Sequence, residues 1–224
     1  MKMDYIISRR IQIASLTYYF LSGALITVGG IILLSIEEIK LYLKTNLAEK
    51  RYTHILGVSD TAKKLAKLNG ISEEKAEIAG LAHDVAKNLS KTRMKEIMEE
   101  NNIVISDVEE NNSNLWHSII GPIEAKNKLG IQEKQILDAI RWHTTGKEDM
   151  SILTKIIYIA DMIEPNRNFE GVEDIRKVTF EDLDTGVYYG LTRSIEFLLI
   201  KNLLIDENTI RARNYFLFDP KFKG

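Results

Sequence analysis

An adjacent histidine and aspartate stand in an apolar stretch, residues 80–87, which reads GLAHDVAK. His83 and Asp84 form the pair, and Lys87 follows about one helical turn later. Burying such a pair is costly unless something binds it. An imidazole beside a carboxylate suits a cation such as iron, manganese or zinc, and the chain has no cysteine to compete as a soft ligand. We therefore predict a metal centre built from histidine and aspartate.

The remaining histidines and one further acid extend this prediction. The chain has four histidines in different expected helices, so one site could collect them all: His54, His83, His117 and His143. Asp161 is the only acid in the apolar residues 152–163, where a solvated role is hard to explain and a ligand role is favoured. Arg51 lies three residues before His54, on the same helix face, and could reach an anion held at the metal.

Each of these residues also has a purely structural interpretation. Asp84 and Lys87 have the spacing of a surface ion pair, although their apolar neighbours argue against a solvated pair. A lone histidine near an apolar face, such as His54, is more often a hydrogen-bonded core residue. His143 stands near Gly146 and has the position of a charge partner at a helix C-terminus. The functional interpretation therefore depends on the set rather than on any one residue.

Composition limits the classes of protein to which the chain can belong. Its 224 residues suffice for one well-buried domain but not comfortably for two. A net charge of −2 shows no basic excess, so duplex nucleic acid is not an expected partner. The absence of cysteine excludes a disulfide scaffold and thiolate zinc sites and fits a reducing cytoplasm. Apolar residues recur mostly at three- and four-residue spacing, which predicts an all-α fold.

The elements that must position these side chains follow from caps and periodicity. Ser35 is the expected N-cap of the first helix of the domain, and Ser72 that of the helix carrying His83 and Asp84, which should continue to about residue 86. Pro122 should bend or interrupt the helix that opens at Trp116. Further helices are expected at 50–69, 91–102, 131–142, 152–163 and 187–204, with a charged loop at 107–114 and a mobile charged segment at 171–184.

Residues 1–35 form a leader that differs from the rest. Residues 11–36 carry no charge and follow Arg9 and Arg10, which would satisfy a transmembrane span or signal-anchor; a core helix is the bland alternative. We favour a third interpretation, an over-extended reading frame. Gly29-Gly30 can be encoded by a purine-rich ribosome-binding signal, and a TTG start codon could follow at Leu34. On that interpretation the domain comprises residues 36–224 and is cytoplasmic; on the anchor interpretation it is attached to the inner membrane.

The order of His54, His83-Asp84, His117, His143 and Asp161 resembles that of the HD superfamily of metal-dependent phosphohydrolases. Four segments resemble the bacterial YqeK family more closely: RYTHILGV at 51–58, HDVAK at 83–87, RWHTTG at 141–146 and YIADMIEPNR at 158–167. The resemblance covers the chain from about residue 36 to its C-terminus. It implies a single HD-domain helical bundle with a metal site in its core.

The resemblance also implies an activity, the symmetrical hydrolysis of diadenosine tetraphosphate to two ADP, with this dinucleoside polyphosphate as the partner. It makes His54, His83, Asp84 and Asp161 ligands of a divalent transition metal, iron in the first place with manganese or zinc as alternatives. His117 and His143 would complete a second metal site or contact phosphates, so one or two ions remain open. Arg51, Lys87 and Arg167 would neutralise the polyphosphate, and Asp84 and Lys87 would be catalytic. Trp116 or Trp142 could stack on adenine, although a core role is favoured for both.

Two alternatives stay open at this point. One is an HD phosphohydrolase of another nucleotide, which a product assay would separate. The other is a membrane-anchored nucleotide sensor that uses the site for binding only; the leader supports it, and the complete ligand set argues against it. The sequence leaves a homodimer open as well.

Overall fold

The structure, a computed structural model, describes the backbone of residues 18–21 and 24–27 and the chain from residue 33 to residue 223. In chain order the described elements are β1 (Tyr18–Leu21), β2 (Ala24–Thr27), α2 (Ile36–Asn46), α3 (Glu49–Leu68), α4 (Glu73–Ala82), α5 (Lys91–Glu100), α6 (Asp107–Asn111), α7 (Trp116–Leu129), α8 (Lys134–Trp142), α9 (Ile152–Ile163), α10 (Val172–Glu181), α11 (Leu183–Ile200), α12 (Glu207–Phe216) and the short 3₁₀ helix η1 (Pro220–Phe222).

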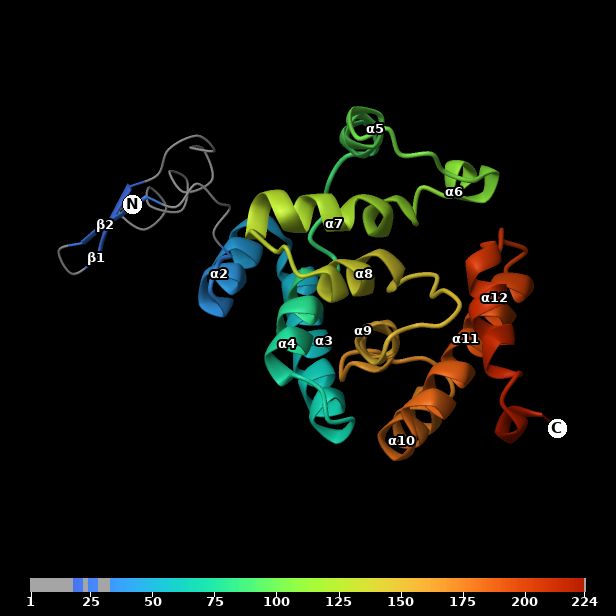
Figure 1. The fold of residues 1–224 in the computed structure, drawn as a ribbon. Coiled ribbons are helices and arrows are strands. Elements are labelled where there is room, and N and C mark those ends of the chain that lie inside the picture. The colour runs from blue at the N-terminus through green and yellow to red at the C-terminus, as the bar shows by residue number, and fades with distance from the viewer. Residues whose placement is uncertain (1–17, 22–23, 28–32, 224) are drawn as a thin grey trace.

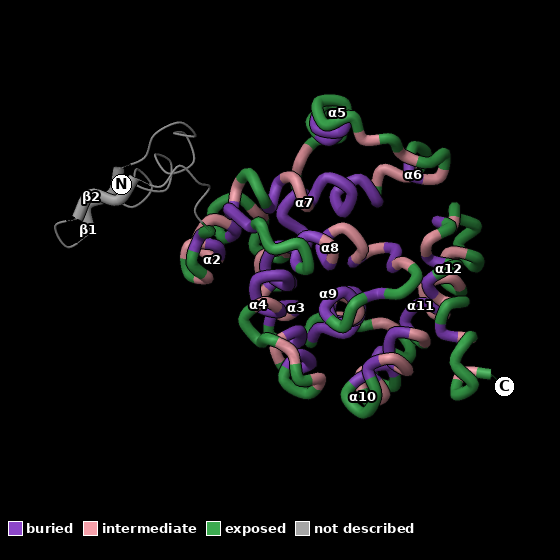
Figure 2. The backbone as a smooth tube through the Cα atoms, viewed as in Figure 1, coloured by how far each residue is buried: buried purple, intermediate pink, exposed green. Residues whose placement is uncertain are grey.

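The helices α2 to α12 form a bundle around α9, which confirms the predicted all-α domain (Figure 1). Helix α9 contacts α3, α4, α8, α10 and α11, which lie around it, while α5 and α6 lie beyond α7. Strands β1 and β2 pair antiparallel, with Tyr18 opposite Thr27, and precede the helices. Purple, buried positions gather on the inward faces of the helices in Figure 2. Most of the buried apolar side chains form one core, and a smaller cluster lies where α5 packs on α7.

Helix α9 occupies the centre because nearly every position along it is apolar. Ser151 caps its N-terminus by accepting a hydrogen bond from the Thr154 N–H. The helix ends at Ile163 because Pro165 follows closely, and a residue that precedes proline avoids the helical region. Glu164 accordingly has an extended conformation, with ψ of 154°. The predicted bounds of this helix are confirmed, and the sharp end matters for the site described below.

Helices α3 and α4 approach each other closely at a glycine. A Cβ atom placed on Gly80 would lie only 2.7 Å from the Ser59 Cα atom, so only glycine allows this spacing. Ser72 caps α4 as predicted, through the Lys75 N–H. The predicted start of the first helix is also confirmed, because Ser35 and Glu38 form a reciprocal capping box.

The prediction that His83 and Asp84 lie within the helix is wrong, because α4 ends at Ala82. From there the chain runs in tighter turns, with the N–H groups of Val85 and Lys87 donating to carbonyls three residues earlier. The Gly80 carbonyl, which a continuing helix would offer to the Asp84 N–H, accepts the His83 ring instead.

Two other local predictions are wrong, and a third is wrong in part. The charged loop at 107–114 contains helix α6, which is started by a capping box between Ser106 and Glu109. The segment expected to be mobile contains α10, whose Val172 and Ile175 are buried and whose Arg176 donates to three carbonyls near the end of α9. Helix α7 runs through Pro122 as one element, so the predicted interruption is wrong, while the predicted bend stays a prediction. Gly121, which has no Cβ, relieves the restriction that proline places on the residue before it.

The leader prediction falls largely outside the described residues, which omit residues 1–17, 22–23 and 28–32. Within the part of the chain that is described, no helix combines the length and apolar character needed to cross a bilayer. The division of the chain at residue 36 stays a prediction.

We predict that Gly80→Ala lowers the free energy of unfolding by about 1–3 kcal/mol, because the added methyl group forces α3 and α4 apart. Chemical denaturation monitored by circular dichroism would measure this. Lys64→Ala, an exposed substitution on α3, is the control and should stay within about 0.5 kcal/mol of the parent protein. Equal stability of the two variants would contradict the tight contact.

Candidate metal centre

The four histidines form a continuous row inside the bundle. His54 lies on α3, His83 directly after α4, His143 directly after α8 and His117 on α7. Neighbouring rings have centroid distances of 5.5 Å (His54 to His83), 5.0 Å (His83 to His143) and 5.0 Å (His143 to His117). All four side chains are buried. The structure therefore brings together histidines that the sequence separates by up to 89 positions, from residue 54 to residue 143.

Two of these rings are held in one tautomer by the carbonyl groups beside them. Nδ1 of His83 lies 2.7 Å from the Gly80 carbonyl, and Nδ1 of His143 lies 2.8 Å from the Ile140 carbonyl. A carbonyl only accepts, so each Nδ1 carries the proton and leaves Nε2 with a free lone pair. Burial lowers the pKa of His83 to about 4, which keeps its ring neutral at pH 7. Neutral imidazoles presenting Nε2 are ready metal ligands.

Nε2 of His54 and Nε2 of His83 are buried without a hydrogen-bond partner in the described part of the chain. Nε2 of His54 nevertheless lies 3.1 Å from Oδ1 of Asp161, without the geometry of a hydrogen bond. Burial alone would lower the pKa of His54, but the Asp161 and Glu164 carboxylates together outweigh it and raise that pKa. The two atoms thus favour a positive charge between them, which a proton or a metal ion supplies. Unpartnered buried nitrogens are rare, and a ligand role explains them.

The Asp84 carboxylate lies between the row of histidine rings and the guanidinium of Arg51. Its Oδ2 accepts from Nη1 of Arg51 at 2.6 Å, and its Oδ1 lies 3.2 Å from Nε2 of His117. Burial alone would raise the pKa of Asp84, but the neighbouring imidazoles hold it well below its usual range. The side chain is therefore a carboxylate at pH 7, which is the form that binds a cation.

The donor atoms fall into two groups that share one histidine. His54, His83 and Asp161 form the first, and His83, Asp84 and His143 the second; within each group the donor atoms lie within 4.8 Å of one another. Two or three nitrogens with a carboxylate oxygen are the donors that divalent transition metals take in proteins. The residues present thus fit a divalent metal ion. The second group includes His143, whereas His117 lies beside Asp84 without belonging to either group.

Cations flank the cluster on its outer side. Nη2 of Arg167 lies 2.5 Å from Oδ1 of Asp161, and Nζ of Lys87 lies 3.2 Å from the ring nitrogens of His117. Burial alone would raise the pKa of Asp161, but the contact with His54 and the charge of Arg167 lower it far more. Burial lowers the pKa of Lys87. These cations offset the buried carboxylates and leave the site suited to an anionic ligand.

Glu164 is a site residue that the sequence analysis missed. Its Oε1 accepts from Nδ1 of His54 at 3.1 Å, which points Nε2 of that ring toward Asp161. Its Oε2 accepts from the Asn166 N–H and side-chain amide. A Cβ atom on Gly57 would lie 2.5 Å from this oxygen, so that glycine makes room for it. The glycine one turn after His54 was the signal that could have revealed a partner.

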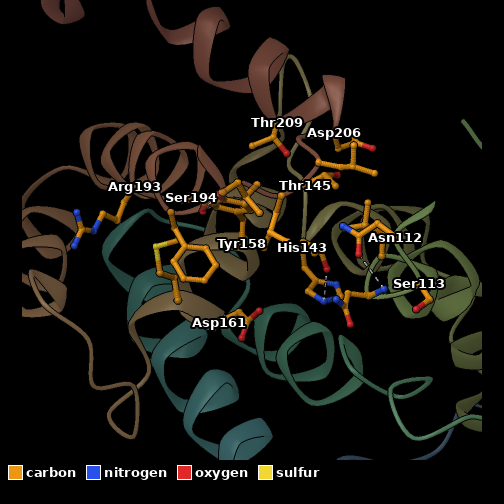
Figure 3. A pocket seen from close by; sticks show the side chains of 18 of the residues that line it. Asn112, Ser113, His143, Thr145, Tyr158, Asp161, Arg193, Ser194, Asp206 and Thr209 are labelled. Atoms are coloured by element: carbon orange, nitrogen blue, oxygen red, sulfur yellow. Dashed lines mark hydrogen bonds between the residues drawn. The ribbon is translucent and has the colours of Figure 1, made fainter. Parts of the chain in front are cut away.

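A pocket of about 850 Å³ opens beside the cluster (Figure 3). Asp161 and His143 lie on one side of it, with Asp206 and Thr209 of the α12 region across from them and Asn112 and Ser113 near its other end. The volume is typical of a pocket for a small organic ligand. Of the predicted substrate-binding residues, His143 and Arg167 line the pocket, whereas Arg51, Lys87 and His117 contact the cluster without being part of that lining.

Neither tryptophan lines the pocket. The Trp116 Nε1–H donates to the Glu109 carbonyl from a buried position, and the Trp142 Nε1–H donates to Asp138 while its ring packs under Arg141. Trp116 therefore has the predicted core role, whereas Trp142 is half-buried and lies outside the core clusters.

Comparison with known proteins agrees with this geometry. The HD domain family matches residues 51–166. The chain is similar to the symmetrical bis(5'-nucleosyl)-tetraphosphatase of Bacillus subtilis, with 38% identity across 81% of this chain and 97% of the relative. The Halalkalibacterium halodurans protein of that description is 40% identical, across 80% and 95%. A solved Clostridium acetobutylicum structure, described as an HD superfamily hydrolase involved in NAD metabolism, aligns with a TM-score of 0.80 and 45% identity over 83% and 98% of the two chains.

We predict that Glu164→Gln weakens metal binding about tenfold, because a neutral amide holds the His54 ring less firmly than a carboxylate does. Metal retention would be measured by elemental analysis after equilibration with graded chelator. Glu170→Gln, an exposed change six residues later, is the matched control. Equal retention by both variants would show that Glu164 does not orient the ligand.

Proposed function

The chain belongs to the HD-domain family and, within it, to the symmetrical bis(5'-nucleosyl)-tetraphosphatases, and we propose from this that it hydrolyses diadenosine tetraphosphate at its central anhydride bond to give two ADP. The observation that carries the proposal is the buried His/Asp cluster, flanked by cations, that opens on a pocket of nucleotide size. A cluster of this kind suits phosphoryl transfer, in which positioning and charge stabilisation do most of the work.

We assign His54, His83, Asp84 and Asp161 as the metal ligands. The free Nε2 lone pairs of the two histidines support the assignment, as does the ionised state of both carboxylates. The second donor group, which adds His143, keeps a second ion open. Iron is the proposed metal, with manganese and zinc as alternatives. Such an ion, when bound, polarises a phosphoryl oxygen and lowers the pKa of water toward neutrality.

The protein's own side chains complete the chemistry. Asp84 is fixed by Arg51 on one side and His117 on the other, which suits it to orient the attacking water or to take its proton. Arg167, at the pocket wall, and Arg51 and Lys87, around the cluster, supply positive charge for the phosphates and for the departing ADP.

We also propose where the protein is located and which class of ligand it binds. We place the HD-type domain in the cytoplasm, on the strength of a cysteine-free composition and a nucleotide substrate. The net charge of −2 supports a small phosphate ligand rather than duplex nucleic acid. Cell fractionation with an antibody against the chain tests the location, and recovery only in the membrane fraction would contradict it.

We predict that purified, metal-loaded protein converts diadenosine tetraphosphate to ADP as the sole nucleotide product. Chromatography of the reaction mixture at early times measures this. AMP together with ATP would show asymmetric cleavage and overturn the proposal, and no turnover would reject the substrate.

Asp84→Ala should abolish both metal retention and turnover, because it removes a ligand that Arg51 and His117 hold in place. Asp60→Ala changes an exposed aspartate of α3 and should leave both unchanged. Full metal content with normal turnover in Asp84→Ala would disprove the ligand assignment.

Lys87→Ala should lower kcat/KM for diadenosine tetraphosphate by about 10- to 100-fold, the size of a lost charged hydrogen bond, while metal content is retained. Steady-state kinetics separates a rise in KM from a fall in kcat. Lys91→Ala, at an exposed lysine four residues later, is the control. An unchanged kcat/KM would remove Lys87 from the phosphate site.

A further inference from the structure

One wall of the pocket is apolar and open to solvent. Phe197 and Ile200, near the end of α11, and Leu203 and Leu204, in the turn before α12, are between 49% and 77% exposed, and all four line the pocket. Large apolar side chains gathered at a concave surface commonly mark a ligand site. Leu199, on the same helix and 64% exposed, is not part of the lining. One face of α11 therefore lines the pocket.

The spacing along α11 explains this wall. Arg193, Phe197 and Ile200 stand at positions i, i+4 and i+7, and therefore share one helix face. Their order places a guanidinium at one end of the face, an aromatic ring next and an aliphatic side chain last. Figure 3 shows Arg193 at one side of the pocket, with Ser194 nearer its middle. The face thus changes from cationic to apolar within two helical turns.

The same pocket reaches the candidate metal centre. Asp161, His143 and Arg167 line it together with the α11 face. The hydrogen bond of 3.2 Å between the Tyr158 and Ser194 hydroxyls ties α9 to α11 beneath it. A ligand with a phosphate at the cluster would therefore extend past Arg167 to an apolar aromatic wall.

We infer that Phe197, supported by Ile200 and Leu204, forms the subsite for the adenine of one half of the substrate. The inference rests on the proposed function, and it adds the residues that hold the base. The order of chemistry along the pocket matches that of an ADP unit: anionic phosphates near the cluster and Arg167, then a planar aromatic base. An aromatic ring at the pocket wall offers a face on which a base stacks.

Calorimetric binding of ADP and of pyrophosphate to the metal-loaded protein tests the inference without any need for turnover. Phe197→Ala should weaken ADP binding about tenfold, the size of one base–aromatic stack, and leave pyrophosphate binding unchanged. Phe197→Tyr keeps the ring and should bind ADP as the parent protein does. Phe180→Ala removes a partly exposed phenylalanine of α10 that does not line the pocket, and should also bind normally.

Three results would overturn the subsite. The first is parental ADP affinity in Phe197→Ala, and the second is an equal loss of ADP and pyrophosphate binding. The third is a dimer of the parent protein that Phe197→Ala dissociates in sedimentation, because the wall would then be a contact with a second copy of this chain. Failure of the proposed function would look different. A parent protein that binds ADP through Phe197 but does not cleave diadenosine tetraphosphate would support the subsite and reject the proposed activity.

Discussion

The site depends on hydrogen bonds that fix imidazole rings at the ends of helices. His83 and His143 each stand directly after the last residue of a helix, and each donates Nδ1–H to the carbonyl three residues earlier. Those carbonyls belong to the last turn, where backbone acceptors lack a helical partner. The ring satisfies the carbonyl, and the carbonyl fixes the tautomer. At both histidines, therefore, the same hydrogen bond ends the helix and leaves Nε2 free to bind a metal.

The rest of the bundle supplies what this arrangement needs. Helix α9 brings Asp161 to the row of rings and then ends before Pro165, which turns Glu164 back onto His54. The buried Asp84, the half-buried Asp161 and four buried imidazoles would be unfavourable together without compensation. Arg51 and Arg167 provide it from the outside, each within 2.6 Å of a carboxylate oxygen. The cost of burying the cluster is thus offset by cations that also face an anionic ligand.

The features predicted correctly from the sequence are those that depend on residues close together in the chain. The caps at Ser35 and Ser72 and the apolar periodicity of α9 predicted helices correctly, because capping and burial act over a few residues. The end of α4 at Ala82 was missed, because a side chain rather than a glycine or proline ends it. Glu164 was missed for a different reason: its partner His54 lies 110 positions away, and Gly57 indicates a close neighbour without identifying it. The pocket is still harder to predict from sequence, because its lining residues come from the loop after α6 and from α9, α11 and α12.

A symmetrical product does not require a symmetrical site. Diadenosine tetraphosphate has two identical halves, so either half presents the same base and phosphates to the protein. If one base rests against the α11 wall, the bond that reaches the cluster depends on the distance between that wall and α9. The contacts between α9 and α11, including the bond from Tyr158 to Ser194, set this distance. The second half then needs no base recognition of its own. The distance from the bound base to the cluster is enough to bring the central bond of the molecule to the cluster.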